Sequence, residues 1–597
     1  TMTPIQIIYA KDLGILPNTN KDMTHLFKSM LEAHPTHTHF ILEKGTYRFS
    51  SDYATQAHYY FSNTDQDNPR HLSIFIKDME NIILDGAGST FIYAGQTSPI
   101  AVDTSRNITI QNIIIDWDIP LSAEGKVIAS CKEWVDMRID TKQFPHYVKD
   151  NQLWFKGENW ESYSNVLYNT FVQFDQTTKK LAYRTGDLFY SENHEQLEDG
   201  LIRFHGSFDP IPTPGNFGVL RHNKRLHPGL FLNQSTNLAI HNVILHNTGG
   251  LGILTQFCDT LSFSNVRFEP NQAKGRRVLT GHDDGLHLSN NKGHITVANC
   301  WFYGLMDDPI NVHGTSLRIT ELVDAHTVKG IFAHHQAIGF DCWAKEGHDI
   351  SFIERLSMAS CGVRQAKSFI LLSPTEFVLT FEGELPEDIQ VGDALENLTN
   401  SPSLLCRHNY FGSCRARGVL VSTPRKVVIE NNVFDSAGSA ILVAGDANAW
   451  YESGACTDVL ICGNHFNECV TSMYQFCEGI ISICPEVPKP ELNKPFHRNI
   501  RIVDNTFMAF DYSVLYALST KGLEFSHNKI IRSYMYKPFG DHKHMINLEY
   551  CQDVRIENNV LLGDVLGQDI HTKGMLSTEN HEETFPINST GTLQYFA

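Results

Sequence analysis

Residues 281–314 read GHDDGLHLSNNKGHITVANCWFYGLMDDPINVHG and contain one pattern twice. The pairs Asp283-Asp284 and Asp307-Asp308 lie 24 residues apart, and a turn-type residue and a short alternating run follow each pair. Neighbouring carboxylates oppose each other's ionisation, so repeating such a pair is electrostatically costly. The regular interval indicates that a structural repeat sets the spacing of the two pairs.

A phrase between the pairs recurs along the chain: an alternating apolar strand, an Asn corner and a second apolar pair. Most neighbouring copies start about 23 to 41 residues apart, and each copy is too short to bury its own apolar face, so the copies must stack. The ten copies are NIILDG from Asn81, NITIQNIII from Asn107, NLAIHNVIL from Asn237, TLSFSNVRF from Thr260, HITVANCWF from His294, KVVIENNVF from Lys426, DVLICGNHF from Asp458, NIRIVDNTF from Asn499, GLEFSHNKI from Gly522 and DVRIENNVL from Asp553.

This repeat predicts an all-β chain folded as a right-handed parallel β-helix, because short β-branched strands alternate with turns rich in Asn and Gly. Equivalent residues of successive coils would then lie one strand spacing apart, roughly 4.8 Å. Asn tolerates left-handed backbone angles, and stacked Asn side chains can hydrogen-bond along the coil. The predicted corner ladder consists of Asn112, Asn242, Asn265, Asn299, Asn432, Asn505, Asn528 and Asn559.

Two intervals are far longer than the others: 130 residues from Asn107 to Asn237, and 132 residues from His294 to Lys426. The extra segments lack the Asn phrase and alternate like antiparallel hairpins, so we predict two inserted small antiparallel β modules of barrel-like form. The predicted division is 1–118 for N-terminal coils, 119–225 for the first module, 226–314 for the coils with the Asp pairs, 315–400 for the second module and 401–597 for C-terminal coils.

The composition limits the classes of molecule that the 597-residue chain can bind. Its 67 acidic and 48 basic residues give a net charge of −19. Nucleic acid and anionic membranes need clustered positive charge, so we predict neither as a partner. No spaced Cys/His set is present, and we expect no metal and no cofactor. The opening TMTPIQIIYA lacks an apolar signal segment. We nevertheless expect a secreted or periplasmic protein, whose export signal lies outside this sequence. The inserted modules and flat coil faces offer surfaces for a homodimer.

Stacked coils would place Asp283 beside Asp307 and Asp284 beside Asp308, which gathers four carboxylates in two adjacent turns. Alternate residues of the following strands point inward or outward. The inward residues would be Leu286, Leu288, Ile310 and Val312, and the outward, exposed polar residues would be His287, Ser289, Asn311 and His313. One carboxyl of such a cluster keeps its proton because of its charged neighbours.

A protonated and an ionised carboxyl side by side are what hydrolysis of a sugar acetal requires: one protonates the leaving oxygen, and the other activates water or attacks carbon. We therefore predict that this four-carboxylate cluster is catalytic, with a structural or calcium-binding cluster as alternatives. Candidate substrate-binding residues are Asp283, His287, Asn311, His313, Arg415, Arg417, Trp450, Glu452 and Glu478, with Trp301, Trp343 and Tyr451 as further rings able to stack on a sugar; Asp283 could also serve only to brace its turn.

One Asp in one coil and an Asp pair in the next resemble the inverting polygalacturonases of glycoside hydrolase family 28, and the matching residues are Asp284 and Asp307-Asp308. The chain has no Gly-His-Gly and no Arg-Ile-Lys downstream, the elements which that family uses near its uronic acid. A pectin substrate is therefore not expected.

Nearly the whole chain is similar to glycoside hydrolase family 110, the bacterial α-1,3-galactosidases. The similarity includes HDDGLHLSNNKGHI, MDDPINVHG, both β inserts and the Asn corners. It implies an exo-acting, inverting, metal-independent β-helix enzyme that releases terminal galactose from Galα1-3Gal in linear, blood-group B-type or algal galactan glycans. The resemblance implies Asp284, Asp307 and Asp308 as the catalytic residues. By analogy with family 28, Asp307 would be the general acid, and Asp284 and Asp308 would hold the attacking water.

Two other classes of function stay open at this point. A polysaccharide lyase or a polygalacturonase-like hydrolase would also suit a β-helix, although no Lys or Arg lies in the two Asp turns. A non-catalytic β-helix would bind a glycan without cleaving it. Stereochemistry is open too, since directly stacked carboxyls favour retention, whereas a diagonal pair, Asp284 with Asp307, would be further apart and favour inversion.

Overall fold

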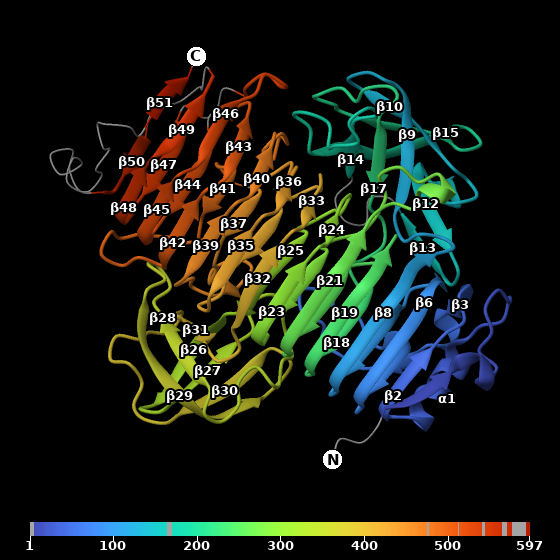
Figure 1. The fold of residues 1–597 in the computed structure, drawn as a ribbon, viewed down its shortest axis with the longest axis horizontal. Helices are drawn as coiled ribbons and strands as arrows, with labels where there is room; N and C mark the ends of the chain where they lie inside the picture. Colours follow the sequence, from blue (N-terminus) through green and yellow to red (C-terminus); the bar gives the residue numbers. More distant parts are fainter. Residues whose placement is uncertain are drawn as a thin grey trace.

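The chain forms a parallel β-helix in the computed structural model, as predicted, and the structure describes residues 5–163, 170–474, 477–511, 513–539, 544–563, 570–575 and 593–596. Figure 1 shows the parallel strands stacked from the blue N-terminal coils to the red C-terminal coils. Two long parallel sheets form the walls of the coil. Among the residues that the structure describes, no helix is long and apolar enough to cross a lipid bilayer.

All ten copies of the phrase lie in the first of these sheets, and each contributes one or two strands to it. The strands before the Asn corner are β1 (Gln6–Tyr9), β2 (Thr36–Ile41), β6 (Glu80–Ala94), β8 (Arg106–Trp117), β19 (Thr236–Leu245), β21 (Asp259–Phe268), β23 (Lys292–Ala298), β32 (Pro402–Arg407), β35 (Val427–Glu430), β39 (Val459–Cys462), β42 (His497–Val503), β45 (Thr520–Ser526) and β48 (Gln552–Glu557), of which β6, β8, β19 and β21 continue past the corner. Separate strands after the corner are β3 (Thr46–Ser50), β24 (Trp301–Phe302), β33 (Tyr410–Phe411), β36 (Val433–Phe434), β40 (His465–Asn467), β43 (Thr506–Ala509), β46 (Lys529–Arg532), β49 (Asn559–Leu562) and β51 (Leu593–Phe596).

The second sheet forms the opposite wall and carries the strands that follow the Asp pairs. Its parallel strands are β5 (Arg70–Lys77), β7 (Ser98–Asp103), β18 (Leu230–Asn233), β20 (Ile253–Gln256), β22 (Leu286–Ser289), β25 (Ile310–Thr315), β34 (Val419–Val421), β37 (Ile441–Val443), β41 (Ile481–Ile483), β44 (Leu515–Leu518), β47 (Ile546–Glu549) and β50 (Ile570–Lys573). The short strands β4 (Thr55–Ala57) and β38 (Glu452–Ser453) pair antiparallel with β5 and β25.

Two closed antiparallel barrels interrupt the coil and lie at opposite flanks of it (Figure 1). The first contains β9 (Ala123–Ser130), β10 (Trp134–Ile139), β14 (Thr170–Phe174), β15 (Asp187–Glu198), β16 (Leu201–Gly206) and β17 (Phe217–Leu220), and beside it lies the sheet β11 (His146–Lys149), β12 (Gln152–Gly157) and β13 (Trp160–Tyr163). The second contains β26 (Leu317–Asp324), β27 (Thr327–Ile331), β28 (Asp349–Ile353), β29 (Ser360–Leu371), β30 (Glu376–Phe381) and β31 (Ala394–Asn397).

One further copy of the phrase was not predicted: SLLCRHNYF from Ser403, which forms β32 and β33. Its corner lies at Asn409, whose side chain donates to Asn432 Oδ1 at 3.0 Å. The 132-residue interval therefore contains a coil strand as well as a barrel.

Stacked phenylalanines fill the core along the first sheet. The last residue of each phrase points inward, and successive rings lie nearly parallel with centroids 4.6 to 5.6 Å apart at Phe268, Phe302, Phe411, Phe434, Phe466 and Phe507. All of these rings are fully buried, and each contributes roughly 1.5–3 kcal/mol by leaving water. At the N-terminal end, the helix α1 (Thr24–Ala33) packs Phe27 against Phe49 and Phe91 and so covers the open end of this core.

The predicted Asn ladder is present in two runs. Asn112, Asn242 and Asn265 are linked side chain to side chain, and all three adopt the predicted left-handed backbone angle. The later run also includes Asn409 and Asn464, which the prediction left out: it links Asn409, Asn432, Asn464, Asn505, Asn528 and Asn559. In this run the residue before the ladder Asn takes the left-handed angle instead, as at Asn431 and Asn558.

We expect Asn432→Ala to lower the free energy of unfolding by about 2–3 kcal/mol, because its buried amide serves four hydrogen bonds that alanine cannot replace. Its Oδ1 accepts from the backbone N and the Nδ2 of Asn409, and its Nδ2 donates to Cys406 O and Asn464 Oδ1. Calorimetric unfolding would measure the change. Asn467→Ala, at a half-buried position outside the ladder, is the control, and an equal loss in both variants would contradict a special role of the ladder.

Candidate active site

The two Asp pairs stand at the same corner of adjacent coils, directly before β22 and β25. These strands pair in parallel with Leu286 beside Ile310, which is the predicted register. The corner is tight: Gly285 N donates to Asp308 O at 3.0 Å, and a Cβ at Gly285 would stand 2.6 Å from Pro309 O. Glycine at this position lets the two coils approach each other and brings the four carboxylates together.

The corner opens into a cavity of about 390 Å³ on the face of the second sheet. Coils, the exit of the first barrel and the second barrel all contribute to its wall. The predicted site residues that line it are Asp283, Asp284, His287, Asp307, Asp308, Asn311, Arg415, Arg417, Trp450 and Glu452. His313 lies behind this wall, against His287, whereas Glu478 is exposed and is not a lining residue.

Arginines hold two of the four carboxylates. Arg417 Nε and Nη2 bind the two oxygens of Asp308 at 2.7 and 2.9 Å, an arrangement that fixes both the charge and the orientation of the carboxylate. Asp283 is fully buried, which by itself disfavours its charge, but Arg225, His282 and Arg221 outweigh burial and lower the pKa of Asp283 below its ordinary value. Both carboxylates therefore have arginine partners, and Asp283 is in addition stabilised in its ionised form.

The other two carboxyls have a raised affinity for protons. Burial, together with the charges of Asp307 and Asp308, raises the pKa of Asp284 well above its ordinary value. Burial and the charge of Asp308 also raise the pKa of Asp307, although Arg225 opposes the shift. Asp307 keeps 23% of its side chain exposed, so it is the member of the pair that faces the cavity most openly. The site thus combines arginine-bound carboxylates with carboxyls whose affinity for a proton is raised.

Arg225 lies at the centre of the cluster. Its guanidinium approaches Asp283 at 3.7 Å, Asp284 at 3.5 Å and Asp307 at 3.5 Å, all on Nη1 or Nη2. No carboxylate receives a short bidentate contact from it, and its Nε has no hydrogen-bond partner among the described residues. Arg225 therefore shares one positive charge among three acids and keeps a donor free.

The diagonal pair of carboxyls, Asp284 and Asp307, is closer than expected, and such a short separation by itself favours retention over inversion. One oxygen from each of Asp284, Asp307 and Asp308 lies within 4.8 Å of one oxygen from each of the other two. One water molecule can donate to two acceptors at this separation, since each hydrogen bond spans about 2.8 Å. The distances also suit oxygen ligands of a divalent cation, so the absence of a metal stays a prediction.

The outward residues of β22 and β25 are buried, which corrects the expectation that they are exposed. His287, Ser289, Asn311 and His313 are at most 3% exposed. Two segments far away in sequence cover them: Ser62 Oγ lies 2.8 Å from Ser289 Oγ, and β38 pairs with the end of β25. Glu452 on β38 accepts from Asn311 Nδ2 at 3.3 Å.

Two of the other candidates are also fixed by contacts. Arg415 binds Asp187 of the first barrel through Nε and Nη2 at 2.6 and 2.5 Å, so its charge is already compensated. Trp450 is 48% exposed and stacks on His334 with ring centroids 4.6 Å apart, which leaves a ring face at the mouth of the cavity.

Three further aromatic candidates do not reach the cavity. Trp343 is fully buried in the core of the second barrel. Trp301 lies on the first sheet, against Tyr410. Tyr451 is buried and accepts a hydrogen bond from Arg318. Aromatic type alone could not distinguish packing residues from sugar-stacking residues.

Sequence reasoning missed the arginines that enter from the first barrel, and it concluded that basic groups were absent from the Asp turns. Arg221 and Arg225 lie in RHNKR (221–225), directly after β17, and this basic cluster was a visible signal. The cavity is also lined by Asn63, Gln336, Asp446 and Glu486. These residues come from distant loops and have no motif that would have identified them.

Comparison with known proteins matches two segments of the chain to family models: the GLAA-B beta-barrel domain I over residues 123–217 and the GLAA-B beta-barrel domain II over residues 327–395. Among solved structures, a family 28 exopolygalacturonase of Yersinia enterocolitica aligns with 96% of this chain and 78% of its own, at a TM-score of 0.40 and 11% identity.

Curated relatives match over almost the full length. Alpha-1,3-galactosidase B of Bacteroides thetaiotaomicron is 42% identical over 96% of this chain and 93% of its own. The protein of the same name from Akkermansia muciniphila is 33% identical over 93% of this chain and 70% of its own. Alpha-1,3-galactosidase A of Bacteroides fragilis is 32% identical over 95% and 94%. The chain therefore belongs to the alpha-1,3-galactosidase family.

Proposed function

We propose that this chain is an exo-acting glycoside hydrolase that removes terminal α-1,3-linked galactose with inversion of configuration. The observation that carries the proposal is the contrast within one cavity between arginine-bound carboxylates and carboxyls of raised pKa. Hydrolysis of an acetal needs both states at once. The family names of the relatives support galactose as the sugar. The resemblance of the Asp arrangement to inverting hydrolases supports inversion, although the short spacing of the carboxyls alone would favour retention.

In this mechanism Asp307 is the general acid, because it has a raised pKa and is the most exposed carboxyl of the cluster. It protonates the leaving oxygen as the glycosidic bond breaks. Asp284 and Asp308 hold a water molecule between them and direct it to the anomeric carbon, which their separation of at most 4.8 Å allows. Arg225 and Arg417 stabilise the negative charge that remains on the aspartates.

The wall of the cavity supplies contacts for sugar hydroxyls. Asn311 Oδ1 and Arg225 Nε are buried and have no hydrogen-bond partner among the described residues, so they offer an acceptor and a donor to a bound sugar. The exposed ring of Trp450 suits stacking on a pyranose face at the mouth. Asp283, held away from the other acids by Arg221, His282 and Arg225, serves mainly to position Arg225.

The enclosed form of the site supports exo action. Gln336 from the second barrel, Arg225 from the exit of the first barrel and Trp450 from a coil loop all line the cavity. A chain end can enter such a hollow, whereas an open groove would admit the middle of a polymer. We propose galactose-terminated oligosaccharides or galactan as partners, a secreted or periplasmic location and a homodimer.

We expect the protein to release galactose from at least one of three substrates: a linear Galα1-3Gal glycan, a fucosylated blood-group B-type glycan and an oligosaccharide of red-algal galactan. Free galactose would be measured in the presence and absence of a chelator, and release should persist with chelator because the carboxylates transfer protons. An unsaturated product from a uronate polymer would indicate a lyase instead. Glycan binding without any release would indicate a binding protein.

Replacing Asp307, Asp308 or Asp284 by Asn should lower kcat by about 10²–10⁴. Asparagine keeps the size and most hydrogen bonds of aspartate but can neither donate a carboxylic proton nor accept one. Asp283→Asn is the matched comparison: we expect a smaller loss of kcat and a larger loss of thermal stability, because Arg221 and Arg225 lose a buried counter-charge. Near-normal turnover of Asp307→Asn would contradict the proposed general acid.

Stereochemistry gives an independent prediction. If water attacks directly, an α-galactoside first yields β-galactose, and no covalent intermediate forms. Proton NMR of the anomeric signals during the first minutes, before mutarotation, distinguishes the two anomers. If α-galactose forms first, the enzyme retains configuration, and an aspartate of the cluster acts as a nucleophile.

A further inference from the structure

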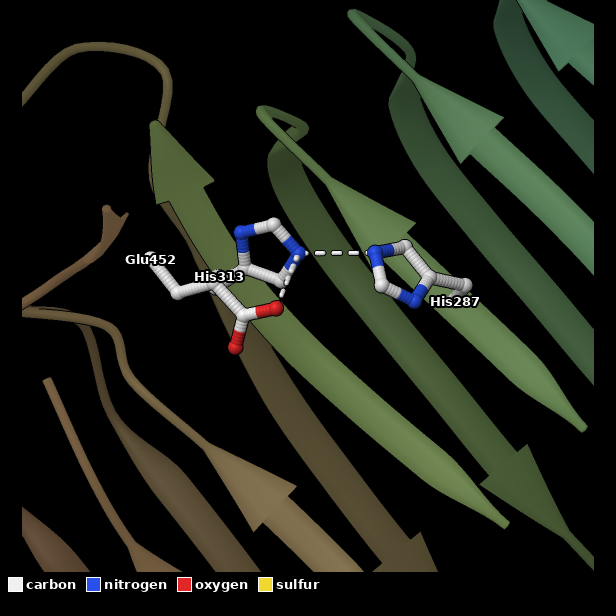
Figure 2. Close-up of side chains that lie close together, drawn as sticks. All are labelled: His287, His313 and Glu452. Carbon is white, nitrogen blue, oxygen red and sulfur yellow. Dashed lines mark hydrogen bonds and ion pairs between the residues drawn. The ribbon is translucent and has the colours of Figure 1, made fainter. Parts of the chain in front are cut away.

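Two buried histidines connect Asp284 to the far side of the cavity wall. His287 Nδ1 lies 2.7 Å from Asp284 Oδ2, and His287 Nε2 lies 2.8 Å from His313 Nε2. His313 Nδ1 lies 2.6 Å from the carbonyl oxygen of Gly314. Figure 2 shows the two imidazoles in contact across adjacent strands, with Glu452 beside His313. The three contacts form one unbranched chain of hydrogen bonds.

The carbonyl at the end of this chain determines where each proton lies. A carbonyl oxygen only accepts, so His313 Nδ1 carries a hydrogen. In neutral His313 the Nε2 is then an acceptor, and it needs a hydrogen from His287 Nε2. Neutral His287 must therefore accept at Nδ1, and the remaining donor is Asp284 Oδ2, as a protonated carboxyl. The hydrogen bonds alone thus require a proton on Asp284 whenever both imidazoles are neutral.

The surroundings agree with this assignment. Burial, with the neighbouring His313 and Arg225, lowers the pKa of His287 well below its ordinary value, so His287 is neutral. The pKa of Asp284 is raised in the same place. Glu452 Oε1 lies 3.7 Å from His313 Nε2, so a second proton on His313 would have a carboxylate nearby. Glu452 is itself held by Asn63 and Asn311.

We propose that His287 and His313 are positioning residues that form a proton relay, through which Asp284 acts as a base although it is protonated at rest. The inference rests on the proposed roles of Asp284 and Asp307. His313 is the end of the relay because it can take up a proton beside Glu452. His287 transmits the proton by receiving it at one nitrogen and releasing one from the other.

Each proton of the hydrolytic step has a defined destination. The water oxygen bonds to the anomeric carbon as the glycosidic bond breaks, and the leaving oxygen takes the proton of Asp307. A water proton moves to Asp284 Oδ1, while the proton on Asp284 Oδ2 moves to His287 Nδ1. The proton on His287 Nε2 moves to His313 Nε2. Asp284 and His287 end neutral, Asp307 becomes a carboxylate, and His313 becomes an imidazolium.

The reverse transfer restores the resting state without any other reactant. His313 Nε2 returns its proton to His287 Nε2, and His287 Nδ1 returns its proton to Asp284 Oδ2. The proton on Asp284 Oδ1 then passes to Asp307 through one bridging water, which can span oxygens that lie within 4.8 Å of each other. The net result is that the water proton regenerates the general acid. The relay thus connects Asp284, which takes the proton of the water, with Asp307, which protonates the leaving oxygen.

A metal on the same side chains is the competing interpretation, since atoms of His287, His313 and Glu452 lie within 4.8 Å of one another. Two imidazole nitrogens on a tetrahedral zinc ion stand about 3.3 Å apart, because each Zn–N bond is about 2.0 Å long. The observed 2.8 Å is a direct hydrogen bond. Stoichiometric metal in the purified protein, lost on His313→Gln, would overturn the relay.

The first test does not depend on activity. Infrared spectra at neutral pH should contain the carbonyl band of a protonated carboxyl group, and the difference between the wild type and Asp284→Asn should isolate the contribution of Asp284. Asp85→Asn is the control, because Asp85 lies on the first sheet away from the cavity and its replacement should leave the band unchanged. Burial opposes the charge of Asp85, but hydrogen bonds from Asn112, Ala87 and Gln111 outweigh burial and lower the pKa of this carboxyl. A spectrum without a band that depends on Asp284 would overturn the resting proton position, whatever the enzyme hydrolyses.

The second test uses His313→Gln, because glutamine can accept the hydrogen bond of His287 but cannot take up a proton. Single-turnover rates should fall at least about tenfold. KM should stay nearly constant, since His313 does not line the cavity. In mixtures of H₂O and D₂O the wild-type rate should follow a bowed curve, because several protons move together, and the variant should follow a straight line.

Ser289→Ala is the matched control, since Ser289 lies beside His313 in the register and on the same buried face. It should keep the wild-type rate and the bowed curve. A His313→Gln enzyme with a wild-type rate and a bowed curve would overturn the relay while the proposed function stands. Absence of galactose release by the wild type would overturn the proposed function, and the infrared test would still decide the resting proton.

Discussion

Parallel stacking in register is the constraint on which the rest of this molecule depends. Each coil places its residues about one strand spacing, roughly 4.8 Å, from the equivalent residues of the next coil. Apolar residues gain from this arrangement, as the column of stacked phenylalanines illustrates, and Asn corners gain hydrogen bonds. Charged residues are forced together by the same geometry. The register that pairs Leu286 with Ile310 makes neighbours of two acidic pairs that nothing else would bring into contact.

The carboxylate cluster could be predicted from sequence because it depends on two features of the chain. These are the period of the repeated phrase and the 24-residue offset between the two Asp pairs. The phrase fixes the corner, the alternation fixes which side chains face inward, and the 24-residue offset fixes the neighbours. The same reasoning failed for exposure. His287 and Asn311 were expected at the surface, yet they are buried because Ser62 and β38 cover them. Burial of these residues by distant segments results from tertiary packing, which local sequence patterns do not indicate.

Arg415 and Arg417 were among the predicted site residues, but Arg221 and Arg225 could not be placed there for the same physical reason. Arg225 follows the first barrel, and Asp187, which binds Arg415, lies within that barrel. Their positions depend on how the barrel docks against the coil, which repeat spacing does not determine. The Asn ladder shows the opposite case: it is set by the coil itself, and its two omitted members, Asn409 and Asn464, lie in phrases with the same corner.

The balance of charge connects this geometry with chemistry. Burying a carboxylate without a partner is costly, and losing one partner of a buried pair costs about 3–5 kcal/mol. The aspartates of the two pairs outnumber the guanidinium groups of Arg221, Arg225 and Arg417 that contact them. Complete ionisation would therefore leave a buried carboxylate uncompensated, and holding a proton relieves that excess. Because the cluster has more carboxylates than contacting guanidinium groups, protonation of an aspartate is favoured. The unequal contacts with arginine determine which aspartates are protonated.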